Sequence, residues 1–277
     1  MNVAIVVAGG RGTRFGGHRP KQFLELNGAP VIVQTLRQFE RAGEIQNVIV
    51  VLPADQTAGF QSLIKKFDLK KVSHVVAGGE TRAQSVRNGL ATIGEANIVA
   101  VHDGVRPLIT PDEIDQVVRV ADDNGAAILV APVGDTVKEI EQDRVKRTAP
   151  RQNLRRALTP QCFRVEVLKR AYERLAEFES SGNEVTDESF LVEQLGGIAD
   201  HIENGSSTIA RAQFLYSRID GRRIGSEVAH QVDVLVEFNQ RHSRICLIED
   251  RIQQGVQATH PRELALGSPS GLNGYHD

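Results

Sequence analysis

Short apolar runs alternate along the chain with segments in which apolar residues recur at helical spacing. The runs are rich in β-branched residues, which is typical of buried strands; they are Val3–Val7, Val48–Leu52, Val72–Ala77, Ile98–Val101 and Ala126–Ala131. Between them, residues 30–39, 60–67 and 82–93 and the segment that starts at Thr110 have helical spacing or a helix-start signal. This alternation predicts an α/β fold, a Rossmann-like, doubly wound and mostly parallel sheet with right-handed crossovers and helices on both faces.

The loop after the first strand is rich in glycine and lies close to two cations. It reads Ala8-Gly9-Gly10-Arg11-Gly12, and Arg14 and Lys21 follow. Glycines let a backbone approach a ligand closely, and such a loop can direct several N–H groups at phosphate oxygens. We therefore predict a cradle for a nucleoside triphosphate.

Three other interpretations of this loop fit the sequence less well. A dinucleotide-binding turn needs a third glycine where Phe15 stands, and a P-loop needs a Gly-Lys-Ser/Thr tripeptide that the sequence lacks. The third interpretation is an ordinary strand-to-helix turn with solvated cations. The nearby Pro20-Lys21-Gln22 segment argues against it.

Two further loops follow predicted strands. Gly78-Gly79 comes after the third strand, and His102-Asp103 ends the fourth. Ligands of doubly wound sheets bind beyond the carboxyl ends of the strands. We expect these loops and the glycine-rich loop to meet at one crevice.

The pattern changes between about residues 134 and 156. Asp135–Lys138 and Val145–Thr148 are predicted to be two strands joined by the charged turn Glu141–Arg144. They are too polar for a core, so we predict a β-arm that leaves the sheet and is supported by a partner subunit in a homodimer. A solvated hairpin on a monomer is the alternative. A helix over Val165–Phe178, another beginning at Thr186-Asp187-Glu188 and a last strand within Gly197–Ile202 complete the predicted fold.

Composition narrows the function further. The chain has 277 residues and a net charge of -2, with a pI of about 6.5, which argues against broad nucleic-acid binding. No apolar run is long enough to span a bilayer. The first strand has no basic leader before it, and Cys162 and Cys246 have neither metal nor disulfide spacing. We therefore expect a cytoplasmic protein without a membrane partner.

A series of motifs resembles one enzyme family. In chain order they are Ala8-Gly9-Gly10-Arg11-Gly12-Thr13-Arg14, Pro20-Lys21-Gln22-Phe23, Gly79-x-x-Arg82-x-x-Ser85-Val86, Val101-His102-Asp103-x-x-Arg106-Pro107, Asp135-Thr136-Val137-Lys138, Arg151-x-x-Leu154, Thr159-Pro160-Gln161 and Thr186-Asp187. Through them, residues 1 to about 207 resemble 2-C-methyl-D-erythritol 4-phosphate cytidylyltransferases of the non-mevalonate isoprenoid pathway. Ribitol-5-phosphate cytidylyltransferase is a close cousin.

The resemblance implies a CTP-dependent transfer of CMP to a sugar-alcohol phosphate, with release of pyrophosphate. The phosphate monoester is largely dianionic at pH 7 and is already a nucleophile, so positioning and charge neutralisation suffice. By resemblance, the catalytic residues are Arg14, Lys21 and Arg151. The nucleotide-binding residues are Ala8, Gly9, Gly10, Gly12, Gly79, Arg82, Ser85, Asp103 and Gly104. The substrate-binding residues are Arg106, Asp135, Arg151, Thr159 and Arg211, and Asp103 is the ligand of a Mg2+ cofactor. Arg151 is expected to reach the neighbouring subunit's site, and His102 to support the Asp103 loop rather than act as an acid or base.

The resemblance ends near residue 208. The family's Asn-Ile-Lys-x-Thr motif corresponds to Thr208-Ile209-Ala210-Arg211-Ala212, so Ala210 replaces a lysine that would hold the substrate phosphate. Residues 208–277 are an atypical C-terminal extension after a cytidylyltransferase domain over 1–207, and residues 267–277 have the composition of disordered segments. Either the lineage has diverged or the reading frame changes near Thr208. Arg211 can supply the lost charge from a different angle.

Other functions stay open beside the leading one. They are a ribitol-5-phosphate cytidylyltransferase, a sugar-1-phosphate nucleotidyltransferase that uses another nucleotide, a nucleotide-binding protein of low activity because of the altered segment, and a NAD-dependent oxidoreductase.

Overall fold

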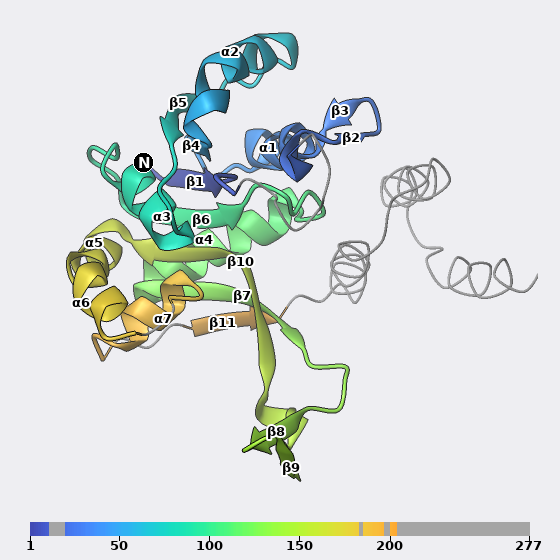
Figure 1. Ribbon diagram of the computed structural model, residues 1–277. Coiled ribbons are helices and arrows are strands. Elements are labelled where there is room, and N and C mark those ends of the chain that lie inside the picture. The colour runs from blue at the N-terminus through green and yellow to red at the C-terminus, as the bar shows by residue number, and fades with distance from the viewer. Residues whose placement is uncertain (11–19, 183–184, 197–199, 204–277) are drawn as a thin grey trace, which may run out of the picture. The chain divides into compact units, whose positions relative to one another are not determined.

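The computed structural model describes residues 1–10, 20–182, 185–196 and 200–203 (Figure 1). The expectations for Gly12, Arg14, Ala210 and Arg211, and for the extension over 208–277, lie outside these residues.

A seven-stranded sheet forms the centre of the described fold. Its strand order is β11-β7-β10-β6-β1-β4-β5. The strands are β1 (Val3–Val7), β4 (Asn47–Leu52), β5 (Val72–Ala77), β6 (Ile98–Asp103), β7 (Ala126–Pro132), β10 (Arg155–Arg164) and β11 (Asp200–Glu203). All neighbours pair in parallel except at β10, which is antiparallel to both β6 and β7. The predicted mostly parallel α/β sheet is confirmed.

Helices cover both faces of this sheet. Alternate residues of a strand point to opposite faces, and the buried side chains accordingly form two separate clusters. The helices of the first cluster are α1 (Val31–Arg41), α2 (Thr57–Lys66) and α4 (Pro111–Asn124), and those of the second are α3 (Arg82–Leu90), α5 (Val165–Glu173), α6 (Leu175–Ser180) and α7 (Glu188–Glu193).

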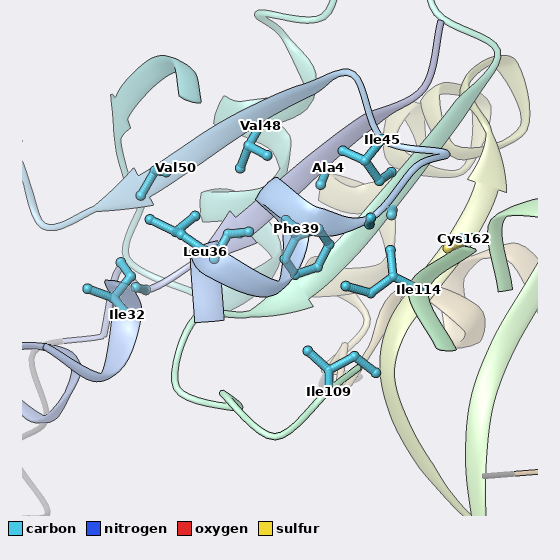
Figure 2. Close-up of a cluster of buried hydrophobic side chains, with 14 of the residues drawn as sticks. Ala4, Ile32, Leu36, Phe39, Ile45, Val48, Val50, Ile109, Ile114 and Cys162 are labelled. Atoms are coloured by element: carbon cyan, nitrogen blue, oxygen red, sulfur yellow. The ribbon is translucent and has the colours of Figure 1, made fainter. Parts of the chain in front are cut away.

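The first cluster packs α1 and α4 against β1 and β4. Figure 2 shows Leu36 and Phe39 of α1 beside Val48 and Val50 of β4, with Ile114 of α4 close by. Leu36, Phe39 and Ile114 are each at most 1% exposed. Full burial of one such side chain contributes about 1.5–3 kcal/mol of transfer free energy, so this layer fixes the strands whose ends carry the candidate site.

The predicted start of α4 is confirmed in detail. Thr110 accepts a hydrogen bond from the Glu113 N–H at 3.2 Å, and the Glu113 carboxylate accepts one from the Thr110 N–H at 2.9 Å. This capping box satisfies two N–H groups that the first turn leaves unpaired. The helix ends at Asn124, and the next residue, Gly125, caps it with a φ of 93°, which favours glycine.

The sequence missed one strand and joined two helices. The strand β10 was not predicted, although it lies between β6 and β7. The helix expected over Val165–Phe178 is two helices, α5 and α6, with Arg174 between them. The strand β6 includes His102 and Asp103, the two residues at which the fourth strand was predicted to stop.

The predicted arm exists, with different strand limits. It consists of β8 (Lys138–Glu141) and β9 (Arg144–Thr148), which form a two-stranded sheet of their own and lie apart from the central sheet in Figure 1. Gln142 and Asp143 make the turn with φ values of 48° and 63°. Residues 135–137, expected to be strand, precede β8. The smaller elements are β2 (Glu25–Leu26), β3 (Ala29–Pro30) and the 3-10 turns η2 (Lys21–Phe23), η3 (Ala54–Gln56) and η4 (Arg151–Asn153).

Across the residues that the structure describes, no helix has the length and apolarity needed to cross a membrane.

Candidate active site

Three loops meet at the carboxyl ends of β1, β5 and β6, as predicted. The Ala8 N–H donates to Val51 O at 2.8 Å, the Gly78 N–H to Leu52 O at 2.7 Å and the Gly104 N–H to Val7 O at 2.8 Å. Each loop is therefore hydrogen-bonded to a neighbouring strand as it leaves the sheet, which fixes the three loops relative to one another.

Glycine is required where these loops touch. A Cβ on Gly78 would come within 2.8 Å of Ser85 Oγ and 3.4 Å of Gly9 Cα. A Cβ on Gly104 would come within 3.0 Å of the Ala8 Cβ. The backbones after β1, β5 and β6 therefore approach so closely that a side chain at Gly78 or Gly104 would force its neighbours to shift.

Gln22 ties the glycine-rich loop to the turn that carries Lys21. Its side chain is buried, and its Nε2 donates to Ala8 O at 2.9 Å and to Gly10 O at 3.2 Å. Because Lys21 begins the short turn η2 that contains Gln22, the same bonds set the position of Lys21 relative to the loop. The sequence analysis singled out Pro20-Lys21-Gln22, but it did not predict the hydrogen bonds that Gln22 makes to the loop.

Asp103 lies between two arginines at the end of β6. Its Oδ1 accepts from Arg82 Nε at 3.2 Å and its Oδ2 from Arg106 Nε at 2.6 Å. Burial alone would raise the pKa of Asp103, but the two guanidinium groups outweigh it and lower the pKa below the ordinary value. The carboxyl group is thus ionised at neutral pH, and its side chain remains 21% exposed.

Behind Arg82 lies a second carboxylate, Glu188 at the start of α7. Its side chain is 0% exposed. Its Oε1 and Oε2 accept from the two terminal nitrogens of Arg82 at 2.7 and 3.0 Å, and Tyr172 Oη donates to Oε1 at 3.1 Å. Burial raises the pKa of Glu188, and the charge of Arg82 opposes that rise. The sequence marked Thr186-Asp187 only as a motif and helix start. No local spacing links Glu188 to Arg82 across 106 residues.

Several predicted ligands hold the loops together through their own hydrogen bonds. The Ser85 hydroxyl donates to Thr81 O at 2.9 Å and accepts from the Gly79 N–H at 3.1 Å. The Thr159 hydroxyl accepts from the Asp103 N–H at 3.3 Å. These contacts give Ser85 and Thr159 a role in loop geometry, and their contacts with substrates stay predictions.

His102 supports the Asp103 loop, as expected. It is fully buried, and its Nε2–H donates to Arg106 O at 3.1 Å, while the Arg106 N–H donates to Asp103 O at 3.1 Å. Burial lowers the pKa of His102 to about 4. The imidazole is therefore neutral at pH 7, with the proton on Nε2.

Asp135 and Arg151 belong to the base of the arm. Arg151 lies in η4 and donates to the carbonyl oxygen of Gly134, and both Asp135 and Arg151 are exposed. The loops after β1, β5 and β6, the start of α3 and the strand β10 therefore bring together several predicted site residues, with Lys21 tied to them by Gln22. They are Ala8, Gly9, Gly10, Gly79, Arg82, Ser85, Asp103, Gly104, Arg106 and Thr159. Asp135 and Arg151 stand on a separate element.

The donor set at the end of β6 limits how a metal can bind. Within the described ranges, no three His, Cys, Asp or Glu side chains form a group that could hold a metal by themselves. Each oxygen of Asp103 accepts one guanidinium N–H and has capacity for a further partner. Since Mg2+ often takes one or two carboxylates and fills its other positions with phosphate oxygens and water, Asp103 fits a magnesium ion that arrives with a nucleotide.

These features define a class. An α/β sheet with a glycine-rich loop after β1, a lysine tied to that loop and an acidic residue at the end of β6 is the arrangement of a nucleotidyltransferase. The family model for 2-C-methyl-D-erythritol 4-phosphate cytidylyltransferase matches residues 2–212. The chain belongs to this family, whose activity is the CTP-dependent transfer of CMP to 2-C-methyl-D-erythritol 4-phosphate in isoprenoid synthesis.

Relatives and solved structures agree with this assignment. The chain is 40% identical over 206 residues to the 2-C-methyl-D-erythritol 4-phosphate cytidylyltransferase of Bacillus velezensis, which covers 74% of this chain and 88% of the relative. It is 44% identical over 195 residues to that of Alkaliphilus metalliredigens, with 69% and 80% covered. The crystal structure of 4-diphosphocytidyl-2C-methyl-D-erythritol synthase from Anaerococcus prevotii superposes with a TM-score of 0.67 at 25% identity, covering 85% of this chain and 96% of that one.

Proposed function

We propose that the chain carries out the family reaction with the following division of roles. The backbone N–H groups of Gly9 and Gly10 and the ammonium group of Lys21 bind the triphosphate of CTP, together with Arg14. Lys21 and Arg14 stabilise the negative charge that develops on the α- and β-phosphates. The observation that carries this proposal is the pair of hydrogen bonds from Gln22 to Ala8 O and Gly10 O, since they hold Lys21 against the loop.

The reaction needs no protein nucleophile or general base. A phosphate oxygen of 2-C-methyl-D-erythritol 4-phosphate attacks the α-phosphorus of CTP, the bond from the α-phosphorus to the bridging oxygen breaks, and pyrophosphate leaves with the electron pair. The attacking phosphate is already largely dianionic at pH 7. The neutral, buried His102 fits a structural role beside this chemistry.

Asp103 would hold a magnesium ion through a carboxylate oxygen. The ion supplies charge neutralisation on the triphosphate when it is bound. Arg82 and Arg106 keep the carboxyl group ionised and orient its two oxygens. Gly79, Ser85 and Gly104 shape the nucleotide side of the site, where a side chain on either glycine would collide with neighbouring atoms.

We assign the binding of 2-C-methyl-D-erythritol 4-phosphate to residues next to Asp103 and at the base of the arm. Arg106 and Thr159 adjoin Asp103 through hydrogen bonds. Asp135 and Arg151 at the base of the arm, and Arg211, complete the proposed set. Arg151 would bind the substrate of a neighbouring subunit, as expected from the family resemblance.

The arm supports a homodimer. Ile140 of β8 pairs with Val145 of β9, and these side chains are 56% and 62% exposed. A two-stranded hairpin is marginally stable alone, and exposed apolar side chains on it favour burial against a second chain. A cytoplasmic location is consistent with the free, buried thiol of Cys162.

Pyrophosphate release tests the proposal. The full chain is incubated with CTP and Mg2+ and with either 2-C-methyl-D-erythritol 4-phosphate or ribitol 5-phosphate. We expect release with the first and at least about tenfold less with the second. Equal or greater release with ribitol 5-phosphate would contradict the substrate assignment, and binding of CTP without release would favour the nucleotide-binding protein of low activity that Ala210 suggests.

A further inference from the structure

Glu188 and Arg82 form an ion pair that no substrate role accounts for. Both oxygens of the fully buried Glu188 accept from the terminal nitrogens of Arg82, at 2.7 and 3.0 Å, and Tyr172 Oη donates to Oε1 at 3.1 Å. All three of these groups donate, so Glu188 acts only as an acceptor, as an ionised carboxylate does. The pair is two-pronged, which fixes the plane of the guanidinium as well as its position.

This pairing decides how Arg82 meets Asp103. A guanidinium has five N–H groups in a fixed fork. Two of them serve Glu188, and Arg82 reaches Asp103 Oδ1 with Nε at 3.2 Å. Arg106 Nε takes the other oxygen, Oδ2, at 2.6 Å. Asp103 thus receives one N–H from each arginine rather than the two-pronged contact that a guanidinium prefers with a carboxylate.

The anchor for this arrangement is the sheet. The N–H groups of Glu188 and Ser189 both donate to Gln161 Oε1, at 3.1 and 3.0 Å. Gln161 lies on β10 and is 1% exposed. Two residues earlier on the same strand, Thr159 accepts from the Asp103 N–H. The single strand β10 therefore binds the backbone at Glu188 and at Asp103, the two carboxylates that Arg82 joins. This gives the Glu188 carboxylate a fixed position relative to Asp103.

We propose that Glu188 is a positioning residue: it occupies the terminal nitrogens of Arg82, which keeps Asp103 able to bind the divalent cation that accompanies the nucleotide. This inference rests on the proposed function, in which Asp103 is the magnesium ligand. Without Glu188, the terminal N–H groups of Arg82 turn to Asp103 and compete with the cation for its oxygens. Glu188 also offsets one positive charge beside the cation.

The test is Glu188→Gln in the full chain, with Glu193→Gln as its matched control. Glu193 lies on the same helix and is exposed, so its substitution makes the same change of charge and shape away from Arg82. Binding of Mn2+ in the presence of CTP, without the second substrate, is measured from the electron paramagnetic resonance of free Mn2+. We expect Glu188→Gln to weaken this binding about tenfold, the effect of one charge-assisted hydrogen bond, and to raise the Mg2+ concentration for half-maximal turnover equally. Glu193→Gln should change neither.

A second background separates positioning from a general effect on α7. Arg82→Gln combined with Glu188→Gln removes both charges, so no uncompensated charge is left buried. Compared with Arg82→Gln alone, this pair should bind Mn2+ no more weakly, because the guanidinium through which Glu188 acts is gone. A pair that binds Mn2+ about tenfold more weakly than Arg82→Gln alone would overturn the proposal, and so would parental binding in Glu188→Gln.

Asp103→Asn distinguishes failure of the inference from failure of the proposed function. If this variant binds Mn2+ as the parent does, the metal assignment in the proposed function is wrong and the inference falls with it. If Asp103→Asn loses the binding while Glu188→Gln keeps it, the inference alone is overturned.

Discussion

The side chain of Gln22 donates a hydrogen bond to the carbonyl oxygen of Ala8 at 2.9 Å across 14 residues of sequence. A second bond from the same nitrogen reaches Gly10 O at 3.2 Å. In Gln22→Met both carbonyl groups lose this partner, at a cost of about 1–3 kcal/mol. Because these groups flank the triphosphate loop, the affinity for CTP with Mg2+ should fall about tenfold, which isothermal calorimetry measures.

Gln34→Met is the matched control for this variant. Gln34 is also buried, and its Nε2 donates to Leu26 O at 2.7 Å, in the β2–β3 turn. It should lower thermal stability by a similar amount and leave CTP affinity unchanged. If both variants weaken CTP binding alike, the glutamine bonds act through overall stability and not through the loop.

Replacing Lys21 should slow turnover more than it weakens binding. Lys21→Ala removes the donor proposed to act mainly on the charge of the transition state, so the rate should fall about a hundredfold or more. Steady-state pyrophosphate release gives kcat, and calorimetry gives CTP affinity. Lys65→Ala, which removes an exposed lysine of α2, should match the parent. Turnover of Lys21→Ala near the parental rate would remove Lys21 from the mechanism.

Much of the sheet could be predicted because its strands are short, apolar and β-branched. The exception is β10, whose sequence contains Pro160 and three arginines. Proline lacks an N–H and argues against a central strand. Here the register shifts between Ala157 and Gln161, so the proline falls in an irregularity of the ladder with β7. This strand forms because it pairs with β6 and β7, which lie elsewhere in the sequence. No local sequence pattern predicts that pairing.

The candidate site likewise has features that the sequence predicted and contacts that it did not. Loops at strand ends and glycines that must approach closely leave local signals, and the convergence of the Gly9, Gly78 and Asp103 segments was predicted. The contacts of Gln161 and Glu188 were not, because each joins elements far apart in the chain. Glu188 in particular reads as an ordinary helix-start residue until α7 packs against Arg82.

The arm can be tested by mixing subunits. If Arg151 serves the neighbouring site, Arg151→Ala mixed with Lys21→Ala should regain part of the activity, because each hybrid dimer contains one site with both residues. Pyrophosphate release is followed after exchange, with each variant alone as the baseline. Absence of recovery, in subunits that mass spectrometry shows to have exchanged, would place Arg151 in its own subunit's site or outside any site.

His102 should make the metal-free protein less stable in acid. The unfolded chain binds a proton with a pKa near 6.5, whereas burial lowers the pKa of folded His102 to about 4. Between these values the unfolded state binds more protons, so the free energy of unfolding falls as pH decreases, by up to about 3 kcal/mol. Urea unfolding from pH 7 to pH 4 measures it.

His102→Gln removes this titration and keeps an N–H near Arg106 O, so the variant should have a flatter pH dependence than the parent. His74→Gln, at an exposed histidine, should retain the parental slope. Identical slopes in His102→Gln and the parent would show that other groups carry the acid sensitivity.

Ala210→Lys tests the departure from the family motif. A lysine there would give the substrate phosphate one more charge-assisted hydrogen bond, of about 1.5–3 kcal/mol. The kcat/KM for 2-C-methyl-D-erythritol 4-phosphate should rise about ten- to a hundredfold, mainly through KM, with CTP affinity unchanged. If KM is unchanged in Ala210→Lys and Arg211→Ala loses affinity for 2-C-methyl-D-erythritol 4-phosphate, Arg211 takes the place of the family's lysine.

The arm enters the sheet through β7 and β10, which pair with each other along their length. The hairpin formed by β8 and β9 is connected to that pair and does not pair with any strand of the central sheet. Its length and sequence can therefore change without moving Thr159 or Gln161 relative to β6. The dimer surface proposed for the arm is consequently free to diverge between species while the geometry of the proposed nucleotide site stays the same.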